Sequence, residues 1–229
     1  FKNEKPDVIF CSQWDMLILG FLLKTKEILI YDNIDMPSSS NIFLYFILRK
    51  LEKFLLKKCD IMIYASRFFE KNYLFFKNKS ILLENLPLRE NYKLISSNRG
   101  DQKTKLAIKL ENIKTINKSK IKLAFIGTIR YYDILKRSID IISKLNYIDY
   151  YFYGDGPDEN KLKEYVKKKK YKNIYFYGRY EYNKISEIYS NIHMVWAAYP
   201  NKDYNVKYAI SNKFFESLVY EKPTFFSKE

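Results

Sequence analysis

Residues 121–156 read IKLAFIGTIRYYDILKRSIDIISKLNYIDYYFYGDG and predict the fold of the chain around them. Ile121–Ile126 and Asp149–Tyr153 are short runs of β-branched and aromatic residues that end at glycine turns, which is typical of strands. Ile134–Leu145, between them, has the apolar spacing of a helix. A strand, a helix and a second strand in this order form a βαβ unit, so we predict two parallel strands.

The same alternation continues in both directions along the chain. Residues 96–120 interrupt it with polar and charged sequence. We therefore predict an α/β protein with a parallel-sheet domain at 1–95, a linker or inserted loop at 96–120, and a second parallel-sheet domain at 121–229. Both domains are expected to be incomplete at the chain ends. Further strands are predicted at 7–12, 28–32, 61–65, 81–84, 173–177, 194–198 and 224–227, and further helices at 14–24, 41–58, 67–75, 159–170, 181–190 and 212–219.

Composition indicates a globular protein. The 229 residues are 47% apolar and 18% aromatic with only 6 glycines and 6 prolines, which excludes disordered and collagen-like chains. No apolar run approaches the roughly 18–20 residues that a membrane-spanning helix needs. Cys11 and Cys59 cannot supply a disulfide framework or a zinc site, and free thiols indicate a reducing compartment. We therefore expect a cytoplasmic protein.

The chain is strongly basic, with 41 Lys and Arg against 26 Asp and Glu and a formal net charge of +15. Coding bias or an anionic partner would each explain this excess. Nucleic acid is not expected, because the sequence has no arginine cluster, RNP-like aromatic pattern or paired Cys/His finger. An anionic membrane surface, at the inner face of the membrane, fits better.

The segment that favours a membrane partner is Asn41–Lys58. On a helix Arg49, Lys50, Lys53 and Lys57 share one arc, and an opposite arc that includes Leu44, Ile47 and Leu55 is apolar and expected to pack. Phe46 lies outside the apolar arc, which favours contact with a membrane interface. An ordinary sheet-covering helix is the alternative.

Several catalytic signatures are absent from the sequence. The single histidine, His193, precedes a strand in an apolar stretch, where a histidine is usually structural, so a His-based metal site is excluded. The sequence contains no Asp-x-Asp pair that would clamp a diphosphate through a divalent metal. The dinucleotide, P-loop and serine-hydrolase motifs are absent too. We expect neither a metal nor a bound cofactor.

Two glycine turns of the second domain follow predicted strands, where ligands bind in such sheets. The small residues of Gly127–Arg130 would let backbone N–H groups approach a phosphate, and Arg130 would neutralise it, helped by Lys136 and Arg137. In Gly154–Asp158 the glycines make a turn and the aspartate can cap the next helix, which is a structural role.

A third turn carries the most informative residues. Ser211 or Asn212 begins a helix, and Lys213 adds a positive charge to its N-terminus. Glu216 lies one turn further along the same side. A carboxylate among apolar neighbours is costly to bury without a partner, and the paired hydroxyls of a ribose would satisfy both its oxygens. An exposed helix carboxylate is the alternative.

The second domain resembles, in the order and spacing of four segments, the donor-binding half of the family 4 glycosyltransferases, which have the GT-B fold. The segments are FIGTIR (125–130), YGDGPDENKLKEY (153–165), NIYFYGRYEYNKISEIYSNIHMVWAAYP (173–200) and ISNKFFESLVYEKPTFFS (210–227). The first domain resembles, more diffusely, the later part of the acceptor-binding half. The resemblance implies two Rossmann-like domains and a metal-independent, retaining transfer. It also implies a nucleoside-diphosphate sugar donor and a glycan or lipid-linked acceptor, in surface polysaccharide or glycolipid synthesis.

The resemblance also implies roles for individual residues. Glu216 would hold the donor ribose, with Asn212 and Lys213 near the diphosphate or the sugar. Arg130 and Lys213 are the expected catalytic groups, because cations stabilise the charge that grows on a departing diphosphate. The diphosphate would contact the Gly127 turn, and the base would lie near Tyr177. By motif position the donor site comprises Gly127, Thr128, Arg130, Tyr177, Gly178, Arg179, Asn212, Lys213 and Glu216.

Some positions depart from the family pattern. Tyr208 stands eight residues before Glu216, where the family often carries a glutamate. A histidine that often follows the second strand of the first domain is missing near Ile34, which leaves Asp35 or Asp32 as the acceptor-side candidate, with a turn role equally open. These departures favour an alternative function, a non-catalytic α/β binding subunit whose basic surface holds a membrane, a nucleic acid or a protein.

Overall fold

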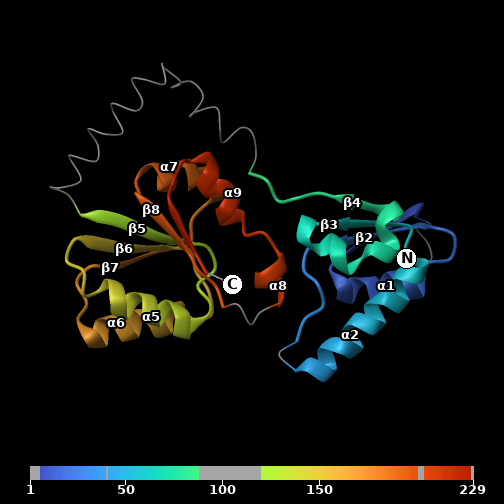
Figure 1. Ribbon diagram of the computed structural model, residues 1–229, viewed down its shortest axis with the longest axis horizontal. Helices are drawn as coiled ribbons and strands as arrows, with labels where there is room; N and C mark the ends of the chain where they lie inside the picture. The colour runs from blue at the N-terminus through green and yellow to red at the C-terminus, as the bar shows by residue number, and fades with distance from the viewer. Residues whose placement is uncertain (1–5, 40, 88–119, 201–203, 228–229) are drawn as a thin grey trace, which may run out of the picture. The chain divides into compact units, whose positions relative to one another are not determined.

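The computed structural model describes residues 6–39, 41–87, 120–200 and 204–227 (Figure 1). They form two compact units: unit 1 is Phe1–Asn85 with Asn201–Ser211, and unit 2 is Leu86–Pro200 with Asn212–Glu229. Each unit contains one parallel sheet, so the prediction of two α/β domains is confirmed. The predicted linker 96–120 lies, apart from Lys120, outside the described residues. Asn201–Ser211, which the sequence placed with the second domain, clusters with unit 1.

The sheet of unit 1 has the strand order β1-β2-β3-β4. Because each strand pairs with the next one along the chain, right-handed crossovers place the connecting helices α1 and α2 on one face (Figure 1). The segment predicted as a helix at 67–75 forms two 3₁₀ helices instead. The elements are β1 (Val8–Ser12), α1 (Trp14–Leu23), β2 (Ile28–Asn33), α2 (Ile42–Leu55), η1 (Leu56–Lys58), β3 (Ile61–Tyr64), η2 (Arg67–Asn72), η3 (Leu74–Lys79) and β4 (Ser80–Leu82).

Unit 1 has one core, on the face that α1 and α2 cover. Alternate strand residues such as Ile9, Leu29 and Met62 pack there against Leu17 of α1 and Leu55 of α2. The residues between them point to the other face, where Val8, Phe10, Ile28 and Ile81 are 44–57% exposed. Parallel sheets are normally covered on both faces. The described part of unit 1 covers only one.

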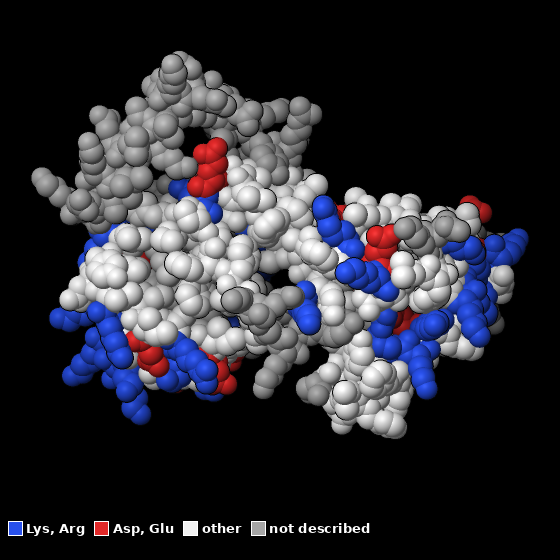
Figure 2. Space-filling view, in the orientation of Figure 1, with Lys and Arg blue, Asp and Glu red and all other residues white. Residues whose placement is uncertain are grey.

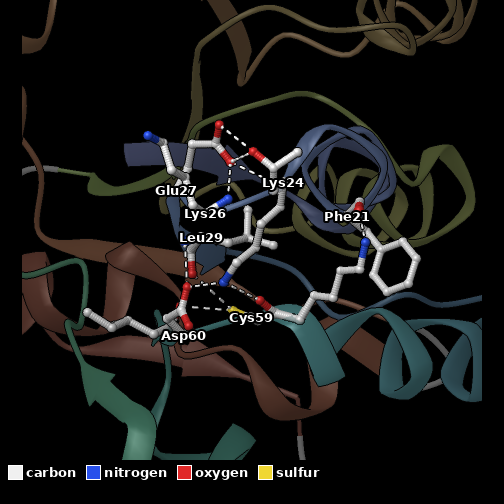
Figure 3. A network of polar contacts seen from close by, with 10 residues as sticks. Phe21, Lys24, Lys26, Glu27, Leu29, Cys59 and Asp60 are labelled. Atoms are coloured by element: carbon white, nitrogen blue, oxygen red, sulfur yellow. Dashed lines mark hydrogen bonds and ion pairs between the residues drawn. The ribbon is translucent and has the colours of Figure 1, made fainter. Parts of the chain in front are cut away.

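A polar network joins the end of α1 to the start of β3 (Figure 3). Lys24 forms an ion pair with Asp60 and donates a hydrogen bond to the carbonyl of Lys58 at 2.8 Å. The Asp60 carboxylate also accepts the backbone N–H of Leu29 in β2 at 2.8 Å. Lys58 in turn donates to the carbonyl of Phe21 at 3.1 Å. These bonds fix the entry of β3 beside β2.

A short helix, α8 (Tyr204–Tyr208), packs on unit 1, and the sequence analysis missed it. The Asn205 side chain accepts the backbone N–H of Met36 at 2.9 Å and donates to the Met36 carbonyl at 3.1 Å. The hydroxyl of the buried Ser66 donates to the Tyr208 carbonyl at 2.6 Å. The Asn205 side chain therefore ties the helix to the backbone after β2, and the Ser66 side chain ties the last carbonyl of the helix to the segment after β3.

The sheet of unit 2 has the order β7-β6-β5-β8-β9. The chain runs outward from β5 to β7 and then returns to the other side of β5, so the switch point, where such sheets bind ligands, lies between β5 and β8. The elements are β5 (Ile121–Ile126), α5 (Tyr132–Ile142), β6 (Ile148–Tyr153), α6 (Glu159–Lys169), β7 (Ile174–Gly178), η5 (Tyr182–Lys184), α7 (Ile185–Ser190), β8 (Met194–Ala197), α9 (Asn212–Val219) and β9 (Thr224–Phe226).

Both faces of this second sheet are covered, and each has its own core. One cluster joins Leu123 and Phe152 to Leu135 of α5 and Leu162 of α6. The other joins Ile126 and Val195 to Tyr189 of α7 and to Val219 and Tyr220 at the end of α9. The structural role predicted for His193 is confirmed, because its Nδ1 accepts the backbone N–H of Lys122 at 2.8 Å. The second core holds α9 beside β8, next to the switch point.

Candidate functional site

Glycine turns at the ends of β5 and β6 pack backbone against backbone. Gly127 and Gly154 have φ of +134° and +131°, values that favour glycine. A Cβ on Gly154 would lie 2.0 Å from the Gly127 carbonyl oxygen, and one on Gly156 would lie 2.4 Å from that of Ile129. Only glycine permits this approach. The turn role predicted for Gly154–Asp158 agrees with this geometry.

The turn after β5 offers fewer backbone donors than predicted. The N–H of Gly127 donates to the Tyr153 carbonyl at 2.8 Å, and that of Ile129 donates to the Asp155 carbonyl at 2.7 Å. Thr128 and Arg130 are exposed, and their N–H groups make no hydrogen bond to a described residue. A phosphate at this turn would therefore meet Thr128 and Arg130, while Gly127 serves to pack the turn.

Asp158 caps a different helix from the one predicted. Its carboxylate accepts the backbone N–H of Tyr132, in the first turn of α5, at 2.9 Å, and it makes no such bond to α6. The prediction that Asp158 caps the next helix is wrong, because packing of the two turns carries its side chain across to α5. One backbone N–H at the N-terminus of α5, that of Tyr132, is therefore already bonded to a carboxylate. The residue just before that helix, Tyr131, is left-handed with φ of +69°.

Glu216 is the centre of a buried polar cluster on α9. Glu216 and Lys213 are only 2% and 8% exposed. The Lys213 ammonium donates to Glu216 Oε2 at 2.7 Å, and the Tyr189 hydroxyl donates to the same oxygen at 2.9 Å. Burial and the nearby Glu216 charge raise the pKa of Tyr189 well above its ordinary value. The alternative of an exposed helix carboxylate is therefore wrong.

The partners of Glu216 leave one oxygen available. Both hydrogen bonds go to Oε2, and Oε1 accepts none from a described residue. The sequence argument that a ribose must satisfy both oxygens is thus corrected, because Lys213 and Tyr189 already compensate the charge. Lys213 was expected near this helix start, whereas Tyr189 comes from α7 and no local sequence signal links it to Glu216.

Lys213 also brings α9 to the glycine turn after β5. A Cβ placed on Gly127 would lie 3.7 Å from Lys213 Cε, so the lysine chain passes directly over this turn. Asn212 begins α9 and is exposed. The structure therefore brings together Gly127, Lys213 and Glu216, at the carboxyl ends of the strands that flank the switch point.

The residues predicted near the base line a groove of about 670 Å³ on unit 2. Tyr177, Gly178 and Arg179 contribute to it, whereas Arg130 and Glu216 do not. Tyr180 relates the groove to the buried cluster around Glu216. It lines the groove, and its pKa is raised by burial and by the charge of Glu216, which acts on its hydroxyl. The groove also contains Lys122, Tyr151, Tyr153, Glu181, Lys184, Glu187, Ile188 and Asn191.

Sequence reasoning missed the tyrosine wall of this groove. The rings of Tyr153 and Tyr177 stack with centroids 4.9 Å apart, and the Tyr151 ring lies 5.9 Å from that of Tyr177. The signal was present, because residues two apart on a strand share one face. It could be used only after β6 and β7 were known to pair.

In unit 1, Asp35 lies just after β2 and is partly exposed. A second polar residue there, Asn33, was not predicted. It is fully buried at the carboxyl end of β2, and neither of its side-chain amide atoms has a hydrogen-bond partner among the described residues. Such a group is costly to bury. Tyr208, where the family often has a glutamate, belongs to unit 1.

The described residues form neither a metal-binding cluster nor a membrane-spanning helix. In the described part of the chain, no group of three or more His, Cys, Asp or Glu side chains is placed to hold a metal ion. No helix there is long and apolar enough to cross a bilayer.

The fold is that of GT-B glycosyltransferases. The chain is similar to HepE from Anabaena in complex with UDP-glucose, with 13% identity and a TM-score of 0.67 over 97% of this chain and 60% of that one. It is also similar to a glycosyltransferase from Rickettsia africae, with 13% identity and a TM-score of 0.60 over 98% of this chain and 58% of that one. Sucrose-phosphate synthase from Thermosynechococcus elongatus gives 10% identity and a TM-score of 0.62 over 96% and 55%.

These likenesses establish the fold alone. The chain spans 55–60% of the length of these three solved structures. Its sequence matches no protein-family model and no curated protein sequence.

Proposed function

We propose that this chain is part of a glycosyltransferase that moves a sugar from a nucleoside-diphosphate sugar to a glycan or lipid-linked acceptor. One observation carries the proposal: the buried Lys213–Glu216 pair lies against the Gly127 turn, with Oε1 of Glu216 still free to accept a hydrogen bond. The shared fold of HepE, which was solved with UDP-glucose, supports it.

In this proposal Glu216 binds the ribose. Lys213 and Tyr189 hold Oε2, which fixes the carboxylate, while Oε1 accepts a ribose hydroxyl. The stacked Tyr153 and Tyr177 rings would hold the base in the tyrosine-lined groove, because aromatic faces stack on one another. Asn212, exposed at the start of α9, would contact the diphosphate or the sugar.

Two cations serve the chemical step. Arg130 is exposed at the turn after β5, and Lys213 passes over Gly127. Both would stabilise the charge that develops on the departing diphosphate, the largest contribution that a site without a metal can make. We propose a metal-independent, retaining transfer in surface polysaccharide or glycolipid synthesis.

Calorimetric titration with uridine diphosphate and guanosine diphosphate tests the nucleotide site. We expect saturable binding of one of them, weakened by about 1–3 kcal/mol in Glu216→Gln because the ribose loses a charged acceptor. Glu164→Gln, at an exposed carboxylate on α6, is the matched control. Equal affinities in the two variants would refute the assignment of Glu216.

A non-catalytic binding subunit that holds a membrane, nucleic acid or protein partner is the second candidate. It is favoured by the Asp158 carboxylate, which occupies the N-terminus of α5 and opposes an incoming phosphate there. Hydrolysis or transfer of nucleotide sugars separates the two functions. Turnover that falls in Lys213→Met would exclude the non-catalytic function.

The cellular location proposed is the cytoplasm. Both cysteines of the chain are free and buried. Burial raises the pKa of the Cys59 thiol to about 12, which keeps it protonated and unreactive.

A further inference from the structure

Helix α2 exposes apolar side chains in its first two turns. The exposed fractions are 72% for Ile42, 72% for Phe43, 46% for Leu44, 58% for Phe46 and 45% for Ile47. An exposed surface of adjacent large apolar groups marks a site of interaction with another molecule or a membrane. We call these five residues the apolar tip.

The tip is exposed because α2 buries a polar edge instead. Glu52 is 1% exposed and accepts hydrogen bonds from the hydroxyls of Tyr31 at 3.0 Å and Tyr73 at 2.7 Å. Arg49 forms an ion pair with it. The prediction that the arc of Leu44, Ile47 and Leu55 packs inward is therefore only partly right, since of these three only Leu55 is buried.

The turns after the tip are basic. Lys50, Lys53 and Lys57 are exposed and form no ion pair with a described residue. Lys53 lies 4.7 Å from the centre of the Phe75 ring, which is itself 51% exposed. The only acidic residue of α2 is the buried Glu52. We call the three lysines the basic collar. Figure 2 shows the uncharged end of α2 with Lys and Arg side chains beside it.

We propose that the apolar tip inserts into the surface of an anionic lipid bilayer and that the basic collar binds the lipid headgroups. Seven residues separate Phe43 from Lys50, a rise of about 10 Å along the helix. A helix that enters the bilayer surface with this end first therefore places the apolar tip up to about 10 Å deeper than the lysines, which reaches the headgroup–acyl boundary when the lysines lie among the phosphates. This inference does not rest on the proposed transfer reaction.

Charge favours a bilayer over a second copy of the chain. In a two-fold dimer through α2, the same patch would face itself, and the collar lysines of one copy would approach those of the other. No exposed acidic residue on α2 would compensate them. An anionic membrane supplies the opposite charge across the whole patch.

Sedimentation with vesicles tests the charge requirement. The chain should bind vesicles of phosphatidylcholine with phosphatidylglycerol, in a salt-sensitive way, and should not bind phosphatidylcholine alone. Lys50→Gln/Lys53→Gln/Lys57→Gln should weaken binding about a hundredfold, since each lysine near the surface contributes about fivefold. The matched control, Lys167→Gln/Lys168→Gln/Lys169→Gln, removes as many charges from the end of α6 in unit 2. It should change binding much less.

A second pair of variants tests the apolar tip. Phe43→Ser/Phe46→Ser should reduce vesicle binding at least about tenfold, because two aromatic side chains no longer leave water. Ile141→Ser/Tyr147→Ser removes two side chains that are 62% and 59% exposed in unit 2 and should have little effect. Tryptophan placed at position 43, as Phe43→Trp, should be quenched by brominated lipid, and Ile141→Trp should not.

Three results would overturn the proposal. The first is an absence of binding to anionic vesicles, and the second is an equal loss in the tip variant and its control. The third is a dimer, seen by light scattering, that Phe43→Ser/Phe46→Ser converts to monomer, which would assign the tip to a second copy. If a serine variant fails to fold by circular dichroism, quenching at Phe43→Trp decides between the outcomes.

Discussion

Lys213 and Glu216, three residues apart on α9, form an ion pair of 2.7 Å that is almost completely removed from solvent. A buried pair of this kind gains little net stability over apolar packing, because both charges lose their hydration. It does hold a carboxylate in one orientation and places an ammonium group over the Gly127 turn. The proposed nucleotide site would use both of these features.

Removing one partner of this pair should destabilise the fold strongly. Lys213→Met leaves the Glu216 carboxylate buried with only the Tyr189 hydroxyl, at a cost of about 3–5 kcal/mol in the free energy of unfolding. Lys213→Met/Glu216→Leu, which removes both charges, should be more stable than Lys213→Met. Urea unfolding followed by circular dichroism measures both.

The exposed pair of Lys163 and Glu159 on α6, also 2.7 Å apart, provides the control. Lys163→Met should cost less than about 1 kcal/mol, because solvent screens a surface ion pair. If Lys163→Met and Lys213→Met lowered the free energy of unfolding equally, burial of the α9 pair would make no difference to its contribution to stability.

The packing of the glycine turns predicts a contrast between two alanine substitutions. Gly154→Ala puts a Cβ 2.0 Å from the Gly127 carbonyl oxygen at φ of +131°, so we expect a loss of at least about 3 kcal/mol. Gly178→Ala meets nothing within 4 Å and carries only the left-handed strain at φ of +74°, about 1–2 kcal/mol. Thermal unfolding compares them, and an equal loss would mean that the turns do not pack as described.

The sheets were predictable from sequence because their information is local. β5 and β6 follow directly from runs of β-branched and aromatic residues that end at glycine. The helix α8 was not predictable, because it has five residues and is held by Asn205 bonds to Met36, far away in the sequence. A short helix is marginal until distant groups stabilise it.

The candidate site was only half predictable for the same reason. The order of Lys213 and Glu216 on one helix marks them from sequence. Tyr189, which holds the same carboxylate oxygen, comes from α7, 27 residues earlier. For α2 the exposed Phe46 was anticipated from sequence, but Leu44 and Ile47 were expected to pack inward, because helical spacing shows an apolar arc and does not say which arc faces the core. The buried contact of Glu52 with Tyr31 and Tyr73 decides that.

His193 should titrate below its usual range. Burial, and then the charges of Lys222 and Lys122, lower its pKa from 6.5. The neutral form is favoured because Nδ1 accepts the backbone N–H of Lys122. Since the folded pKa is the lower one, this stability is complete above about pH 6.5 and is lost as the pH falls toward the folded pKa.

As the only histidine in the sequence, His193 gives a single imidazole signal for nuclear magnetic resonance titration. In His193→Gln the loss of stability between neutral pH and about pH 5 should be smaller than in the parent. A midpoint at or above 6.5 would contradict the buried, neutral imidazole.

The free energy of unfolding should also depend on the ionisation of Asp60, in a more acidic pH range than for His193. Its pKa is lowered from 3.8, chiefly by the side-chain hydrogen bond from Lys24 and then by the backbone N–H of Leu29. The folded state therefore binds its proton less readily than the unfolded chain does. The resulting stability is complete above about pH 4 and is lost as the pH falls through the folded pKa.

Asp60→Asn should be less stable than the parent at neutral pH, and the two should converge in acid. Urea unfolding at a series of pH values measures this, with Glu164→Gln, at an exposed carboxylate, as the control. A difference between Asp60→Asn and the parent that stays constant from neutral pH into acid would show that the Lys24–Asp60 contact at the entry of β3 does not depend on charge.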